Sequence, residues 1–86
     1  MRYSISKTFE KQFSKLPRKI KSKTIARLEL FIVEPFHTSL NNHQLKGEWS
    51  DYRSINISGD IRAVYKYTDG SVAHFIAIGS NSELYE

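Results

Sequence analysis

The chain of 86 residues has no cysteine, so disulfides, thiolate metal sites and cysteine nucleophiles are excluded. Long apolar runs are absent too. The longest, residues 28–33, is interrupted by Glu29 and is far too short to span a bilayer. Residues 1–27 contain nothing like the apolar core of a signal peptide. We therefore expect a cytoplasmic protein that does not associate with a membrane.

Phosphate loops and metal sites have no signature in the sequence. The four glycines are isolated from one another, so none of them belongs to a glycine-rich loop. His37, His43 and His74 lack the spacing of metal ligands. Neither a serine elbow nor the spacing of a catalytic triad is present. The sequence predicts neither a metal nor a cofactor.

Acidic side chains are scarce in the first third of the chain. Residues 1–27 carry nine basic side chains against the single acid Glu10, a local charge of +8, whereas residues 28–86 carry −4. Such a basic segment attracts a polyanion or an acidic protein, and the alternative is a solvated helix face. The candidate phosphate contacts near the junction of two predicted helices are Lys15, Arg18, Lys19, Lys21 and Lys23.

Two helices are predicted in the first half, after a short alternating strand at residues 3–6. Ser6 or Thr8 caps the first helix, and Pro17 ends it or opens the second, which extends to about Glu34. The apolar stripe of the first helix is Phe9, Phe13 and Leu16. The apolar stripe expected on the second is Ile20, Ile25, Leu28, Phe31 and Ile32.

Three strands are predicted after a polar loop at residues 36–50. The predicted strands are residues 51–57, 61–67 and 71–78. Turns at residues 58–60 and 68–70 join them, and the mostly apolar last strand is expected at the centre of the sheet. The order β-α-α-β-β-β predicts one α+β domain over residues 1–86, with two helices packed on one face of an antiparallel sheet. The other face is left open for a ligand.

Candidate ligand contacts lie on and around these strands. Arg53 and Arg62 are on neighbouring strands, where a short hairpin can bring both within reach of one phosphate. The alternative is that each pairs with a surface carboxylate such as Asp51 or Asp60. His43, in the polar loop, is a candidate for proton transfer or phosphate contact. The aromatic residues that offer stacking surfaces for bases, if they do not simply pack, are Trp49, Tyr52, Tyr65, Tyr67 and Tyr85.

Three motifs in the second half carry a family resemblance. They are His43-x-Leu45-x-Gly47-x-Trp49-x-x-Tyr52-Arg53, Ile57-x-Gly59-Asp60-x-Arg62-x-x-Tyr65 and Ile78-Gly79-Ser80-Asn81-Ser82-Glu83-Leu84-Tyr85. With the preceding helices, they resemble the RelE/ParE superfamily of bacterial type II toxins, particularly the YafQ-like mRNA interferases. The resemblance covers nearly the whole chain and implies the small RelE-like fold.

The resemblance also implies an activity. Such a toxin cleaves mRNA in the decoding site of the ribosome, through attack of the ribose 2′-hydroxyl on the adjacent phosphate and without a metal or cofactor. A cognate antitoxin neutralises it, and operator DNA is contacted only through the antitoxin complex. The chain would then be a metal-independent endoribonuclease that inhibits translation.

Individual residues match family positions. His43 matches the loop histidine, Asp60 the acidic residue after the hairpin turn, and Arg62 the phosphate-binding arginine of the RelE branch. Tyr85 matches the C-terminal aromatic residue that stacks on a base. Arg53 matches a basic position at the start of the strand that follows the loop. The resemblance therefore implies a catalytic and phosphate-binding set on and beside the strands.

Two asparagines depart from the family pattern. Asn56 stands where YafQ-like enzymes often have histidine, and Asn81 where the family usually has histidine or, in the RelE branch, arginine. An amide can bind phosphate but cannot shuttle a proton near neutral pH, so both stay in the candidate site. Either His43 and Asp60 suffice for proton transfer, or this chain is slow or inactive, and an engineered change at Asn81 is a further alternative. The alternatives are a degenerate toxin homologue that serves as antitoxin partner and co-repressor, and a ParE-type gyrase inhibitor, which would need neither His43 nor Tyr85.

Overall fold

The computed structural model describes residues 1–85, and the side chains of residues 1–84. Strand β1 (Arg2–Ile5) leads into helices α1 (Lys7–Ser14) and α2 (Arg18–Val33). The predicted boundaries are confirmed by their chemistry. The Ser6 hydroxyl caps α1 by accepting from the Phe9 N–H at 3.0 Å, and Pro17 is the residue before α2.

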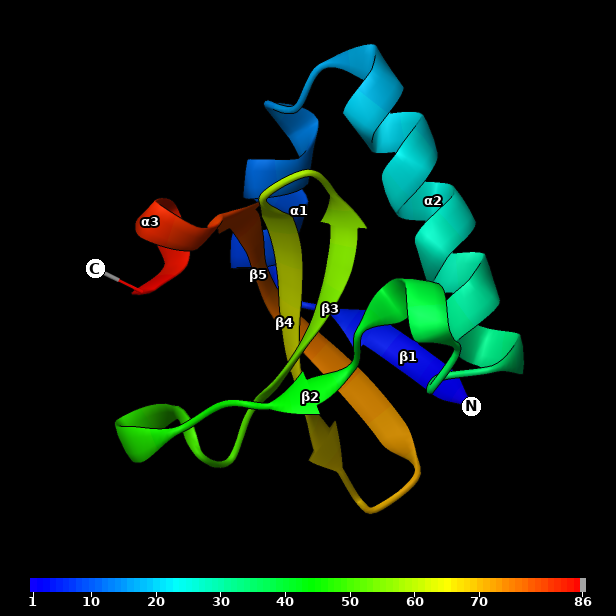
Figure 1. Cartoon of the computed structure of the whole chain (residues 1–86), viewed down its shortest axis with the longest axis vertical. Helices are drawn as coiled ribbons and strands as arrows, with labels where there is room; N and C mark the ends of the chain where they lie inside the picture. Colours follow the sequence, from blue (N-terminus) through cyan, green and yellow to red (C-terminus); the bar gives the residue numbers. More distant parts are fainter. Residues whose placement is uncertain (86) are drawn as a thin grey trace.

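The remaining strands form one twisted sheet with β1 (Figure 1). They are β2 (His43–Gln44), β3 (Arg53–Ser58), β4 (Ile61–Thr68) and β5 (Val72–Ser80). The strand order is β1-β5-β4-β3-β2, with β1 parallel to β5 and every other pairing antiparallel. The α+β class is confirmed, although the parallel β1–β5 pair makes the sheet mixed and not antiparallel throughout. β4 is the central strand, and β5 is an interior strand between β1 and β4, which fits its apolar run.

The structure adds short elements within the predicted loop and after the last predicted strand. Two 3₁₀ turns, η1 (Thr38–Leu40) and η2 (Gly47–Trp49), flank β2 within the predicted loop. A short helix, α3 (Asn81–Tyr85), follows β5 directly. No helix of the described part of the chain is long and apolar enough to cross a membrane.

The apolar face of α2 differs from the predicted stripe. Leu28 and Phe31 are buried as expected, but Ile25 and Ile32 are 53% and 40% exposed. Thr24 is buried in their place, and its hydroxyl is satisfied because it donates to the Ile20 carbonyl at 2.7 Å. The helix therefore faces the sheet along positions 24, 28 and 31, and residues one position further on are rotated by about 100° away from it.

The core lies between the helices and one face of the sheet. Phe31 of α2 packs edge-on against Tyr65 of β4 and Phe75 of β5, with ring centroids 5.1 and 5.3 Å apart. The strand residues that complete the buried cluster are Ile55, Ile57, Ala63, Ala73 and Ile78. These aromatic contacts fill the space between α2 and the two strands.

Two bulges adjust the register of the strands. One lies in β3 between Asn56 and Ser58, and the other in β5 opposite the Val64–Tyr65 step of β4. Between these bulges the ladder is regular, and it sets Asn56, Arg62 and Gly79 side by side in one row. Residues that lie directly opposite on neighbouring strands project from the same face, so this row marks the face opposite helices α1 and α2, which we call the uncovered face.

Candidate functional site

Three of the predicted site residues project from that uncovered face. Arg62 of β4 pairs with Asn56 of β3, and His43 of β2 pairs with Ser54, which is two residues from Asn56 on the same face. From strand spacing and rise, the Cα atoms of His43 and Arg62 lie about 12 Å apart, with β3 between them. Two long side chains at that separation can reach the same nucleotide.

His43 is held by its own loop. Its Nδ1 atom lies 2.8 Å from the Asn41 carbonyl oxygen. A carbonyl only accepts, so Nδ1 carries the hydrogen, and in the neutral ring Nε2 has the lone pair. The side chain is exposed, so this lone pair can meet a ligand proton. His43 is therefore arranged to accept a proton at Nε2, because Nδ1 already donates to the Asn41 carbonyl.

Arg62 is loosely held. Its Nη1 donates to the Gly59 carbonyl at the long distance of 3.5 Å, and within residues 1–84 it forms no ion pair. The predicted alternative, a surface pair with Asp51 or Asp60, is therefore not seen among the side chains described. Most guanidinium donors are left for an anion, and a half-buried position on a strand limits where they can point.

Arg53 lies on the opposite face. It pairs with Tyr65, whose ring is in the core, and its Nε donates to Asn42 Oδ1 at 2.9 Å. Its guanidinium also lies over the Phe36 ring, 5.3 Å from the centroid. Arg62 pairs with Asn56, which is three residues from Arg53 along β3, and side chains an odd number of residues apart on a strand project from opposite faces. The expectation that Arg53 and Arg62 clamp one phosphate is therefore wrong.

Two buried polar atoms on the uncovered face have no hydrogen-bond partner within the described residues: Ser54 Oγ and Asn56 Oδ1. Both belong to β3, between His43 and Arg62. Buried polar atoms are nearly always paired in folded proteins. Both atoms are buried, so neighbouring residues cover this stretch of β3, and the side chains that a ligand can meet directly are those at its margins, such as His43.

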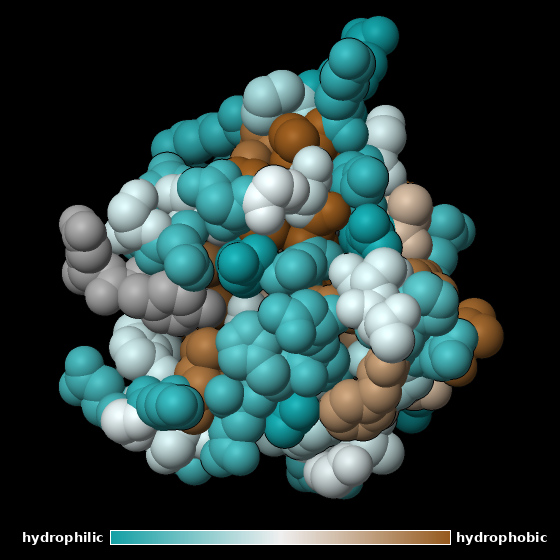
Figure 2. Space-filling model, viewed as in Figure 1, coloured by the Kyte–Doolittle hydropathy of each residue, from teal (hydrophilic) through white to brown (hydrophobic). Residues whose placement is uncertain are grey.

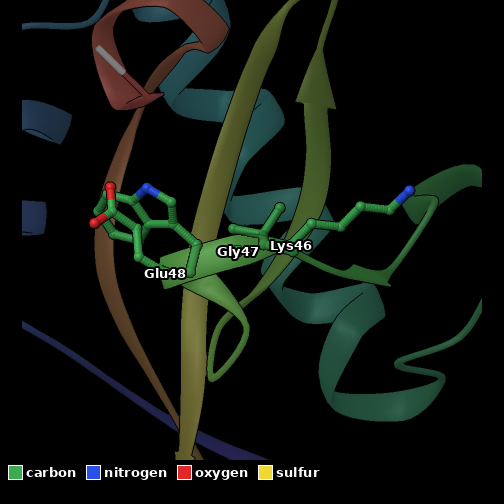
Figure 3. Close-up of a pocket in the computed structure, with 5 residues that line it drawn as sticks. Lys46, Gly47 and Glu48 are labelled. Atoms are coloured by element: carbon green, nitrogen blue, oxygen red, sulfur yellow. The ribbon is translucent and has the colours of Figure 1, made fainter.

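A hollow of about 710 Å³ lies beside β2 and is lined by residues 45–49 (Figure 3). In Figure 3 the side chains of Lys46 and Glu48, two of the lining residues, extend in opposite directions. Trp49 packs edge-on against Tyr52 at 5.5 Å, and Lys66 lies 5.5 Å from the centre of the Tyr52 ring. Figure 2 shows mostly hydrophilic atoms over this part of the molecule. An aromatic pair beside a cation is suited to a base and its phosphate.

The tail at the end of β5 lies over the same face. A side chain at Gly79 would meet Glu83 Oε1 at 3.2 Å and Leu84 at 3.6 Å. Ser80 and Glu83 form a capping box, in which Glu83 Oε1 accepts from the Ser80 N–H at 2.8 Å and the Ser80 hydroxyl accepts from the Glu83 N–H at 3.3 Å. These hydrogen bonds, from the Ser80 backbone first, lower the pKa of Glu83.

The capping box explains the helix that the sequence analysis missed, because Ser-x-x-Glu is its signature. Asn81 is the first residue of α3 and is exposed. Asp60 is exposed in the β3–β4 turn, next to the left-handed Gly59. Tyr85 was expected to stack on a base, but its side chain is outside those that the structure describes. Because Ile61 pairs with Ser80, Asp60 and Asn81 both lie just beyond the row that contains Arg62, at the same end of the sheet.

The basic cluster lies in the helix layer. Lys15, Arg18, Lys19 and Lys23 are exposed, whereas Lys21 is half-buried with its ammonium 6.0 Å from the centre of the Phe13 ring. The α1–α2 junction and β2 are at opposite ends of the molecule in Figure 1. The cluster is therefore a surface separate from His43.

The other two histidines have structural partners. His74 Nδ1 lies 2.8 Å from Ser4 Oγ across the β1–β5 pairing, and His37 Nδ1 accepts from the Ser39 N–H at 3.1 Å. Within the described residues, no group of three histidine, aspartate or glutamate side chains is arranged to hold a metal ion. Tyr65, one of the predicted stacking residues, is fully buried and packs in the core.

A sequence model of a bacterial toxin of type II toxin–antitoxin systems, YafQ, matches residues 1–86. The chain belongs to the YafQ toxin family. It is thus a type II toxin, and the predicted family is confirmed. No curated protein sequence matches the chain significantly.

Solved structures of this toxin class have the same fold. YafQ from E. coli strain BL21(DE3) has a TM-score of 0.81 and 24% identity, over 100% of both chains. The toxin of the E. coli DinJ–YafQ complex has a TM-score of 0.79 and 24% identity, over 98% of this chain and 96% of that one. A chain of the archaeal RelE–RelB complex from Pyrococcus horikoshii has a TM-score of 0.73 and 19% identity, over 92% of both.

Proposed function

We propose that this YafQ-family toxin is a metal-independent endoribonuclease that cuts mRNA in the decoding site of the ribosome and so stops translation in the cytoplasm. One observation carries the proposal. His43, with an available Nε2 lone pair, and Arg62, with an almost unused guanidinium, project from the same uncovered face. That face offers a base and a cation, which 2′-hydroxyl attack on a phosphate requires.

Each residue takes one step. His43 Nε2 accepts the 2′-hydroxyl proton, and O2′ attacks the adjacent phosphorus while Arg62 stabilises the charge that develops on the phosphate oxygens. The P–O5′ bond breaks, and the departing oxygen takes a proton from a water molecule beside Asp60. The products are a 2′,3′-cyclic phosphate and a 5′-hydroxyl. No residue of this sequence requires a metal.

Substrate is held by groups around that centre. Asn56 and Asn81 hydrogen-bond the phosphate or base without moving a proton, and Tyr85 stacks on a base. The exposed cations of the α1–α2 junction hold ribosomal RNA phosphates. Arg53 is left out of the phosphate contacts, since it is bound to Asn42 on the other face. Two amides in place of proton-transfer groups make slow cutting the expectation.

A cognate antitoxin is the protein partner. The complexes formed by YafQ with DinJ and by RelE with RelB support this assignment. Contact with operator DNA then occurs only through the toxin–antitoxin complex. The experiment that tests the nuclease is expression of the chain with and without translation of a reporter message. We expect growth arrest and cuts in translated transcripts only, and growth arrest with intact transcripts would contradict the proposal.

The second candidate is a degenerate toxin that binds antitoxin and co-represses without cutting RNA. The presence of asparagine at both position 56 and position 81 favours it. Asn81→His separates the two candidates. If the unmodified chain is harmless and this change restores cutting on ribosomes, the degenerate function is supported. If the unmodified chain already cuts, that function is excluded.

A further inference from the structure

The segment that presents His43 needs support from outside its own strand. β2 has only the residues His43 and Gln44, paired with Ser54 and Arg53 of β3. A strand at the edge of a sheet with so few ladder contacts frays easily. The residue immediately before it, Asn42, is half-buried and belongs to neither η1 nor β2.

The Asn42 amide uses all of its hydrogen-bonding capacity. Its Nδ2 donates to the Pro35 carbonyl at 2.9 Å and to Tyr65 Oη at 2.8 Å. Its Oδ1 accepts from Arg53 Nε at 2.9 Å and from the Tyr65 hydroxyl at 3.1 Å. An amide offers two donor hydrogens and two acceptor lone pairs, so four contacts fill it. We call Asn42, Tyr65 and Arg53 the Asn42 clamp.

The clamp is anchored in the core. Tyr65 is fully buried, and its ring packs against Phe31 and Phe75 with centroids 5.1 and 5.0 Å away. Burial, reinforced by hydrogen bonding with Tyr67, raises the pKa of Tyr65 to about 12. Its hydroxyl therefore keeps its hydrogen at physiological pH and can donate to Asn42 Oδ1.

The backbone transmits this anchoring to His43. Asn41 adopts the left-handed conformation, with φ of 44° and ψ of 49°, and its N–H donates to the Thr38 carbonyl at 3.1 Å. Its own carbonyl accepts from His43 Nδ1 at 2.8 Å. Asn42 lies between these two residues, so fixing its side chain fixes the peptide on each side. A left-handed asparagine is an acceptable but restricted conformation that the surrounding contacts must maintain.

We propose that the Asn42 clamp positions His43, holding the Asn41 carbonyl against Nδ1 so that the neutral ring presents Nε2 as proton acceptor to the uncovered face. Asn42, Tyr65 and Arg53 are positioning residues, because they act through His43 and lie on the core side of the sheet. The effect on catalysis rests on the proposed nuclease function, whereas the orientation and tautomer of the His43 ring do not depend on that function.

The test is the tautomer of His43, measured by long-range ¹⁵N–¹H correlation NMR on the purified chain. The spectra are recorded at a pH of about 8, above the pKa of histidine in model peptides. We expect the unmodified chain to show one neutral tautomer with the hydrogen on Nδ1. In Asn42→Ala, both tautomers should appear in exchange, while the amide spectrum of the sheet is retained. Tyr65→Phe, which keeps the ring, should give a smaller shift in the same direction.

Thr24→Val is the matched control, because it removes another buried hydroxyl from the far side of the core. It should leave the His43 tautomer unchanged. A single Nδ1–H tautomer in folded Asn42→Ala would overturn the proposal, and so would a shift of equal size in Thr24→Val. If Asn42→Ala does not fold, Tyr65→Phe decides, and an unchanged tautomer there also overturns the proposal.

Cutting on ribosomes provides the second readout. A catalytic group displaced by about 1 Å can lose on the order of 100-fold in rate, so Asn42→Ala should lower kcat by about 10- to 100-fold with little change in KM. If the unmodified chain does not cut RNA but the tautomer responds as expected, the nuclease function fails and the clamp stands. If the unmodified chain cuts and the tautomer does not respond, the clamp fails and the function stands.

Discussion

The two faces of the sheet use the same strands for opposite purposes. On the helix-covered face, Phe31, Tyr65 and Phe75 pack ring against ring, and Arg53 is tied to Asn42. On the other face, Arg62 has one long hydrogen bond, and buried acceptors of β3 have no partner within the described residues. Successive side chains of a strand point to opposite faces, so the same strands build a packed core on one face and leave hydrogen-bonding groups unused on the other.

Arg53 and Arg62 show the difference within one residue type. The two residues lie on neighbouring strands. The Arg53 guanidinium binds Asn42 and Phe36 of the loop, whereas the Arg62 guanidinium is available to an anion. Apart from the Asn42 clamp, substitutions on the covered face should therefore change stability, and substitutions on the uncovered face should change activity.

The largest effect is expected from Phe31→Ala on the covered face. Phe31 is fully buried and packs against Tyr65 and Phe75, so truncation should lower the free energy of unfolding by about 3–5 kcal/mol. Urea denaturation followed by circular dichroism measures it. Ile25→Ala, on the exposed side of the same helix, is the control and should cost less than about 1 kcal/mol. Equal losses would contradict the placement of the core.

Arg62→Ala should have the next largest effect, on activity alone. Losing a fixed cation that meets developing charge typically lowers rate by about 10²- to 10³-fold. The rate is measured on ribosomes that carry mRNA, and the free energy of unfolding should change by less than about 1 kcal/mol. Arg2→Ala, which removes a guanidinium from β1 at the far edge of the sheet, should cut normally. Cutting at the unmodified rate by Arg62→Ala would remove this residue from the mechanism.

Alkaline pH should weaken the covered face through Tyr65. Its pKa is raised from 10.0 to about 12 in the folded protein, chiefly by burial. The unfolded chain therefore loses this proton first, and stability present below pH 10 falls as the pH approaches 12, by up to about 2 kcal/mol. Urea midpoints across this range measure the fall. Tyr65→Phe should lack this contribution, and an identical pH dependence in both proteins would count against it.

The smallest effect concerns the helix cations. Replacing Lys15, Lys19 and Lys23 with glutamine should reduce the slope of log affinity for ribosomes against log salt by about two units, because fewer counterions are released. All three side chains are exposed, so the fold should be retained. Arg2→Gln is a single-charge control. An unchanged slope would reassign the cluster to a solvated surface or to antitoxin docking.

Local chemistry made much of the fold predictable. The Ser6 cap, the break at Pro17 and the turns at Gly59 and Gly70 each depend on one or two residues with a strong conformational preference. β2 escaped prediction because two residues have no periodicity, and its existence depends on pairing with β3. α3 was predictable from Ser80 and Glu83.

The site was less predictable, because it depends on register. The residue types at His43, Asp60 and Arg62 indicated the chemistry, whereas the face from which each projects follows from which residues pair across strands. A shift of one residue reverses a side chain's face, which is why Arg53 was wrongly grouped with Arg62. Thr24 was overlooked for another reason: its hydroxyl is satisfied by its own helix, so a polar residue could be buried.

The chemistry of the cut ends tests the central claim most directly. Purified toxin would be added to ribosomes stalled on a defined mRNA, and the RNA termini would be identified by selective ligation and mass spectrometry. Attack by the 2′-hydroxyl, with His43 as base and Arg62 at the phosphate, predicts a 2′,3′-cyclic phosphate and a 5′-hydroxyl on translated mRNA alone. Termini with a 5′-phosphate, or intact mRNA on ribosomes that the toxin has bound, would contradict it.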